Sequence, residues 1–200
     1  MPLSNPEPSD EPPLILSIGR LVEKKGFPIL LRAAAMLRRE GIDFRLRIIG
    51  TGPDEPDLRR LASGLALEEC VQFDGPVPHE ELLPLFRTAD LFVLASIVAS
   101  DGDRDGLPNV LLEALALGVP VVSTRVSAIP ELIEHEETGL LVNPGDPGGL
   151  AEQMERLLFD EQLRAKVIEQ GRREVVTRFD VKENVAKLAD LFTEVMKRRR

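Results

Sequence analysis

Short apolar runs alternate along this chain with stretches in which apolar residues recur every three or four positions. The runs have the length of buried strands, and the stretches between them have the spacing of amphipathic helices. Strands that are apolar on both faces are typical of a parallel sheet with helices on both sides. The pattern therefore predicts a doubly wound, Rossmann-like α/β fold. Its six expected strands span 14–19, 44–50, 70–73, 91–96, 119–124 and 139–142.

Helical patterns fill the intervals between these strands. After Asp146 the whole chain reads as helical, with breaks near Asp160 and Phe179. A last amphipathic helix is expected over 181–197, and we expect its apolar face to pack on another surface. The earlier helices are expected at 30–39, 57–64, 79–89, 109–117 and 130–134.

The first 13 residues are rich in proline and polar side chains, which is typical of a linker or a cloning remnant. They contain neither a basic region nor an apolar core, so we do not expect a signal peptide. We therefore expect two segments, a linker over 1–13 and one folded domain over 14–200.

Composition excludes several classes of protein. The 200 residues carry 25 basic and 34 acidic side chains, a net charge of −9, which argues against general nucleic-acid binding. A single cysteine, Cys70, excludes an internal disulfide and makes a reducing cytoplasm the default location. Trp and Tyr are absent, so few aromatic platforms exist for stacking sugars or bases. No apolar run approaches the ~20 residues of a membrane span.

A ligand site is expected where the strand order reverses, beyond the carboxyl ends of the strands. With the common order 3-2-1-4-5-6, that point lies between strands 14–19 and 91–96. Arg20 and Lys25 follow the first of these, in a loop that leads to a helix start. Two cations beside free helix N–H groups suit a phosphate or diphosphate. The alternative is that Lys24 and Lys25 are only solvated surface charges.

The loop after the second of these strands contains alternating aspartates, Asp101, Asp103 and Asp105. They resemble the start of a calcium loop, but position 12 is Leu112 instead of the bidentate Glu that such a loop needs. We favour a pair formed by Asp105 and Glu113, which would face one cavity and accept hydrogen bonds from hydroxyl groups. The alternative is helix capping with a buried, paired glutamate.

Three other features are weaker candidates. The GTG at 50–52 lacks the third glycine of a dinucleotide fingerprint and is interpreted as a tight turn. Neither His79 nor His135 is placed for catalysis, and Cys70 is expected to be a small buried apolar residue. The KRRR at 197–200 would suit either an anionic membrane surface or a helix C-terminus.

Four motifs in the right order resemble the carboxyl-terminal domain of family-4 retaining glycosyltransferases of the GT-B fold. They are IGRLVEKKG (18–26), VQFDGPVPHEEL (71–82), DGLPNVLLEALALGVPVVSTRVSAIPELI (105–133) and TGLLVNPGD (138–146). The segment DGDRDGLPNVLLEA is similar to the corresponding sequence in bacterial enzymes of exopolysaccharide and lipopolysaccharide assembly. The resemblance implies a domain that binds a nucleotide-sugar donor, UDP- or GDP-linked, and transfers sugar only together with an amino-terminal acceptor domain.

The resemblance also implies roles for single residues. Arg20 and Lys25 would bind the donor diphosphate, with Gly19 in the same loop. Glu113 would bind the ribose hydroxyls. Asp105 would contact the donor sugar, at a position where the family commonly has the longer Glu. These four charged side chains are the expected catalytic set.

Backbone groups complete the expected site. The stretch with Val77 would lie against the base, and the segment after Asp105 would approach sugar and phosphate. No metal or other cofactor is expected, because the cations replace it. The segment comprises Gly106, Leu107, Pro108, Asn109, Val110 and Leu111.

The expected partners are the nucleotide sugar, the acceptor domain and a glycan or lipid-linked acceptor, without nucleic acid. The expected location is the cytoplasm, at the inner face of the membrane through peripheral contact of the full-length protein. A non-catalytic nucleotide-binding or regulatory module with the same fold is the alternative.

Overall fold

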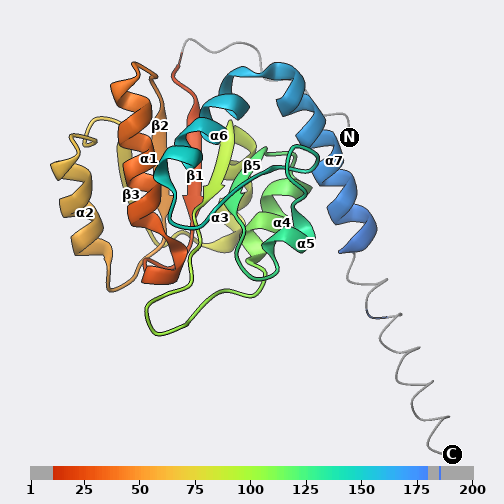
Figure 1. Ribbon diagram of the computed structural model, residues 1–200, viewed down its shortest axis with the longest axis horizontal. Helices are drawn as coiled ribbons and strands as arrows, with labels where there is room; N and C mark the ends of the chain where they lie inside the picture. Colours follow the sequence, from red (N-terminus) through yellow and green to blue (C-terminus); the bar gives the residue numbers. More distant parts are fainter. Residues whose placement is uncertain (1–10, 180–184, 186–200) are drawn as a thin grey trace, which may run out of the picture.

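A computed structural model describes residues 11–179 and 185. In this part of the chain, six parallel strands form one sheet in the order β3-β2-β1-β4-β5-β6, which confirms the predicted fold class and strand order (Figure 1). The strands are β1 (Leu14–Ile18), β2 (Arg45–Ile49), β3 (Val71–Gly75), β4 (Leu91–Leu94), β5 (Val121–Thr124) and β6 (Leu140–Val142).

The helices fall in the predicted intervals, with small shifts at their starts. They are the short 3-10 helix η1 (Glu23–Lys25), followed by α1 (Phe27–Arg39), α2 (Glu55–Gly64), α3 (His79–Thr88), α4 (Asn109–Ala116), α5 (Ile129–Leu132), α6 (Pro147–Phe159) and α7 (Glu161–Arg178).

The start of the first predicted helix is corrected by three residues. The helix expected to begin at residue 30 begins at Phe27, because Gly26 precedes it in a left-handed conformation and Pro28 suits its first turn. Helix α4 begins at Asn109, as predicted, and Pro108 lies just before it with extended backbone. The predicted break near Asp160 is confirmed, since the Asp160 side chain accepts a hydrogen bond from Leu163 N–H and caps α7.

Both faces of the sheet are buried, as the apolar strands predicted. Ile15 and Leu16 of β1 are fully buried but belong to different cores, because successive side chains of a strand point to opposite faces. Helices α1, α2 and α6 cover the core that contains Ile15, whereas α3, α4 and α5 cover the core that contains Leu16. Helix α7 packs against α6 and α4 and so joins the two layers (Figure 1).

Some expectations fall outside the described residues. They concern most of the linker, the last amphipathic helix over 181–197 and the basic end at 197–200. Within residues 11–179 and 185, no helix is both long enough and apolar enough to cross a bilayer.

Candidate functional site

The carboxyl ends of β1 and β4 are neighbours, since these two strands pair directly. The chain leaving β1 passes through η1 into α1, and the chain leaving β4 runs irregularly from Ala95 to Pro108 before α4 begins. Both connections therefore emerge at one edge of the sheet, where the strand order reverses. The starts of α1 and α4 add free N–H groups and positive dipole ends to this edge.

Gly26 allows the two connections to touch. Its φ is +65°, and a Cβ atom added there would lie 1.8 Å from the carbonyl oxygen of Ala95. A hydrogen bond of 2.9 Å from Ile97 N–H to the Lys24 carbonyl continues the contact. Glycine is thus required for the close approach of the loops that carry the candidate residues.

The GTG motif lies under the loop that carries Arg20, and the tight turn begins only at its last residue, Gly52, whose carbonyl accepts a hydrogen bond from Glu55 N–H at 3.2 Å. Gly50 has a φ of +138°, and Cβ atoms at Gly50 and Gly52 would lie 1.9 and 2.1 Å from the carbonyl oxygens of Gly19 and Leu21. Leu21 N–H donates to the Thr51 carbonyl at 2.9 Å. The motif therefore supports the backbone of the Arg20 loop.

Lys25 and Asp105 meet across the two loops. The Lys25 Nζ lies 2.6 Å from the Asp105 Oδ2, and the side chains are 13% and 15% exposed. This oxygen is buried and forms no hydrogen bond of good geometry among the described residues, so its contact with the Lys25 ammonium is electrostatic. The structure thus brings together two residues that the sequence placed in one cleft.

Lys24 is not a solvated surface charge, contrary to the alternative interpretation. Its Nζ lies 3.0 Å from Asp103 Oδ2 and 3.5 Å from Asp105 Oδ1, and its side chain is 20% exposed. The Asp103 hydrogen bond raises the pKa of Lys24, and the same bond from Lys24 lowers the pKa of Asp103. The charge of the exposed Arg20 also lowers the pKa of Asp103.

The calcium interpretation of the aspartates is not supported by this geometry. Ammonium groups of Lys24 and Lys25 contact the carboxylates of Asp103 and Asp105. In the part of the chain that the structure describes, no group of three or more acidic, His or Cys side chains is arranged to hold a metal ion.

Glu113 lies in the second turn of α4 and is partly buried. Within residues 11–179 and 185 it forms no ion pair, which argues against the alternative of a buried, paired glutamate. No hydrogen bond or ion pair joins Glu113 to Asp105 among these residues, so binding of one ligand by both side chains stays a prediction. Both nevertheless lie on the same connection from β4.

The remaining predicted contacts differ in exposure. Gly106 and Asn109 are exposed, and a Cβ atom at Gly106 would meet open space, so a ligand can approach the backbone there. The other predicted contacts contribute to packing. Leu107, Val110 and Val77 are partly buried against the core under α3, α4 and α5, whereas Pro108 and Leu111 are buried.

The histidines and the cysteine have no place in this site. His135 Nδ1 accepts a hydrogen bond of 3.1 Å from Leu141 N–H and so orders the turn before β6. His79 is exposed as the first residue of α3. Cys70 is only partly buried, and burial raises the pKa of its thiol.

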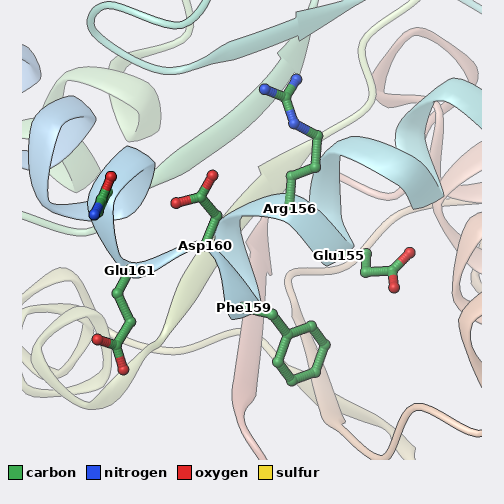
Figure 2. A pocket seen from close by; sticks show the side chains of 6 residues that line it. Glu155, Arg156, Phe159, Asp160 and Glu161 are labelled. Atoms are coloured by element: carbon green, nitrogen blue, oxygen red, sulfur yellow. The ribbon is translucent and has the colours of Figure 1, made fainter.

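Two other pockets contain none of the candidate site residues. One lies at the junction of α6 and α7, where Arg156 and Phe159 point in different directions from the end of α6 (Figure 2). This junction is near the amino ends of the strands, because Arg164 of α7 pairs with Asp90 at 3.3 Å just before β4. The other pocket lies between α5 and the end of α7, and its lining includes Arg125 and His135.

Sequence reasoning missed the residues that join the two loops. Glu23 accepts hydrogen bonds from Ser100 N–H at 2.9 Å and Ser100 Oγ–H at 3.0 Å. Lys24 and Asp103 form the second cross-link. The alternation of acidic residues over 101–105, opposite two lysines, is the signal that could have revealed these pairs.

The fold and this edge define a doubly wound α/β domain with a cationic ligand site at its topological switch point. Comparison with known proteins places that domain in a family. The model of the family "Glycosyl transferases group 1" matches residues 4–174, and the chain belongs to this family. The fold is that of the carboxyl-terminal domain of a GT-B glycosyltransferase.

Individual relatives agree with this assignment. The chain is 40% identical to the amylovoran biosynthesis glycosyltransferase AmsK of Erwinia amylovora over 181 residues, 90% of this chain and 44% of AmsK. It spans less than half the length of AmsK and of the other curated relatives that it resembles in this way.

Two solved structures have the same architecture. The C-terminal domain of a glycosyl transferase group 1 family protein, LpcC, from Francisella tularensis is 26% identical with a TM-score of 0.74, over 85% of this chain and 88% of that domain. Anabaena HepE in complex with UDP-glucose is 25% identical with a TM-score of 0.79, over 92% of this chain and 49% of HepE.

Proposed function

We propose that this domain binds the sugar donor of a retaining, family-4-like glycosyltransferase at the edge between β1 and β4. The observation that carries the proposal is the meeting of Lys25 and Asp105, one from each connection, with the exposed Arg20 on the same connection as Lys25. A cation cluster faced by a carboxylate suits a molecule with a diphosphate next to hydroxyl groups. A nucleoside diphosphate sugar is such a molecule, and the relative HepE was crystallised with one.

Arg20 and Lys25 are the proposed diphosphate ligands. The planar guanidinium binds phosphate oxygens in a fork, and the ammonium acts as a mobile point charge. Both would stabilise the charge that develops on the leaving diphosphate, so they are proposed to act in the reaction as well as in binding. We propose that these cations replace a metal ion and that the domain needs none.

Asp105 and Glu113 are the proposed hydroxyl ligands. Asp105 accepts a hydrogen bond from the donor sugar, and Glu113 accepts those of the ribose. The exposed backbone at Gly106 and Asn109 lies between them in sequence and would approach sugar and phosphate. The base is proposed to lie against the segment that contains Val77.

Transfer is proposed to need an acceptor-binding domain in addition to residues 14–200. The reacting hydroxyl must be held about 3–3.5 Å from the donor carbon in a site closed to water. One edge of one sheet, open to solvent at Arg20 and Gly106, does not meet these conditions. Given the role named for AmsK, we propose a glycan or lipid-linked acceptor in polysaccharide assembly, at the cytoplasmic face of the membrane.

A thermal-shift panel tests the binding proposal. UDP, GDP, ADP and their sugars are added to the chain with and without EDTA, since a ligand bound to the native state raises Tm by mass action. We expect one nucleoside diphosphate and its sugars to raise Tm without metal. No shift with any of them would contradict the proposal, and a shift that disappears with EDTA would contradict its metal-independence.

A further inference from the structure

Lys24 and Lys25 are adjacent in sequence, and each contacts a different carboxylate oxygen of Asp105. Lys25 Nζ lies 2.6 Å from Oδ2, and Lys24 Nζ lies 3.5 Å from Oδ1. Lys24 is also anchored by Asp103 at 3.0 Å, and both lysines are largely shielded from solvent. Asp105 is therefore held from two sides by cations with different surroundings.

The backbone around Lys24 is fixed to the loop that carries Asp105. Glu23 binds Ser100 through both carboxylate oxygens, and the Lys24 carbonyl accepts from Ile97 N–H at 2.9 Å. These contacts are made by Lys24 itself and by the residue before it. Lys24 thus keeps its position relative to the loop even when a ligand changes the partner of Lys25.

A donor diphosphate would compete with Asp105 for the Lys25 ammonium. Both are anions, and Asp105 already lies in contact with Nζ. If the diphosphate binds Lys25, Asp105 loses its nearest cation while its side chain stays largely buried, which is costly for a carboxylate. Lys24 is the cation that remains beside it.

We propose that Lys24 is a positioning residue that holds Asp105 in place for the donor sugar while the diphosphate occupies Lys25. The inference rests on the proposed function, because it assumes a nucleotide-sugar donor at this edge. It adds that Lys24 increases the gain in affinity that the donor sugar provides, although Lys24 itself need not contact the donor. Asp105 also acts as a competitor for bare nucleoside diphosphate.

The test compares two ligands of one series in each variant. The nucleotide sugar is the one among UDP-glucose, UDP-galactose, GDP-mannose and GDP-fucose that raises the Tm of the wild-type chain most, and it is paired with its own nucleoside diphosphate. Calorimetry gives the dissociation constant of the nucleoside diphosphate divided by that of its nucleotide sugar. This ratio measures the gain in affinity that the sugar provides. A general loss of positive charge in Lys24→Met weakens both ligands and cancels in this ratio.

We expect Lys24→Met to reduce the sugar-dependent gain in affinity by about three- to fivefold, the scale of a partly exposed ion pair. Lys24→Arg should restore most of it. In the Asp105→Asn background, Lys24→Met should cause no further loss, because Lys24 acts through Asp105. Asp105→Asn alone should leave affinity for bare nucleoside diphosphate unchanged or stronger.

Lys166→Met is the matched control. Lys166 lies on α7, and its Nζ pairs with Glu137 at 2.6 Å, away from the site between β1 and β4. This substitution should leave the ratio unchanged. The inference is overturned if Lys24→Met leaves the ratio unchanged. It is also overturned if Lys24→Met lowers the ratio as much in the Asp105→Asn background as in the wild-type chain. A wild-type chain that binds no nucleoside diphosphate overturns the proposed function, and with it this inference.

Discussion

The Lys25 ammonium contacts the Asp105 carboxylate at 2.6 Å, although 80 positions separate the two residues. This contact joins the connection that follows β1 to the connection that follows β4. It converts two polar loops into one site at the edge where the strand order reverses.

Glu113→Ala should weaken nucleoside diphosphate binding more than Asp105→Ala does. Ribose is common to every donor, whereas the proposed partner of Asp105 is the sugar, which a bare diphosphate lacks. Loss of a hydrogen bond to a charged group costs roughly 1.5–3 kcal/mol. Calorimetric titrations of both variants with UDP and GDP measure the difference, and equal losses would contradict the division of roles.

The Lys24–Asp103 pair should be visible in the titration of Asp103. Its pKa lies below the ordinary 3.8 because Lys24 donates a hydrogen bond to the charged form. A lowered folded-state pKa means that the pair stabilises the fold above pH 3.8 and that this contribution is lost as the pH falls through the folded value. Carboxyl NMR should show the Asp103 pKa returning toward 3.8 in Lys24→Met.

Glu136 is the internal control for that titration. Its pKa is lowered by a hydrogen bond from Arg156, away from the site. It should not change in Lys24→Met. An Asp103 pKa that is equally low in both proteins would show that Lys24 does not control it.

Gly26→Ala should destabilise the domain by about 3 kcal/mol or more, because a Cβ atom there would overlap the Ala95 carbonyl, 1.8 Å away, at a positive φ. Gly41→Ala is the matched control. Gly41 also has a positive φ, +81°, but its Cβ would meet open space, so the cost should be about 1 kcal/mol. Urea unfolding of the two variants measures both values, and equal losses would show that the loops do not need this close approach.

The chain alone should bind nucleoside diphosphate but transfer no sugar. Labelled nucleotide sugars are incubated with the chain and with candidate glycan and lipid-linked acceptors, with and without EDTA. We expect no glycosylated acceptor above the control without protein. Product above that control would mean that residues 1–200 suffice for transfer.

The fold was largely predictable because its strands are apolar on both faces. Such strands require two helical layers, and the strand order assumed from that class is the observed one. Arg20 and Lys25 could be assigned to the candidate site because both lie in the connection that follows β1. The helix start at Phe27 was missed because it depends on the left-handed conformation of Gly26, which apolar spacing does not reveal.

The cross-loop pairs were harder to predict. Lys24 and Asp103 are 79 positions apart, and only the three-dimensional path of the loop after β4 brings them together. In sequence, Lys24 is indistinguishable from a surface lysine, and the aspartates resemble a metal loop. The ion pairs decide between these interpretations, and a sequence contains no direct record of them.

The most direct test of the account is calorimetric titration of wild-type chain, Arg20→Ala and Lys25→Ala with a nucleoside and its diphosphate in EDTA. Each substitution should weaken diphosphate binding by about tenfold or more, as expected for loss of one hydrogen bond to a charged group. Affinity for the bare nucleoside should hardly change. If nucleoside and diphosphate binding fall in parallel, the two residues support the fold and do not bind phosphate, and the central claim is wrong.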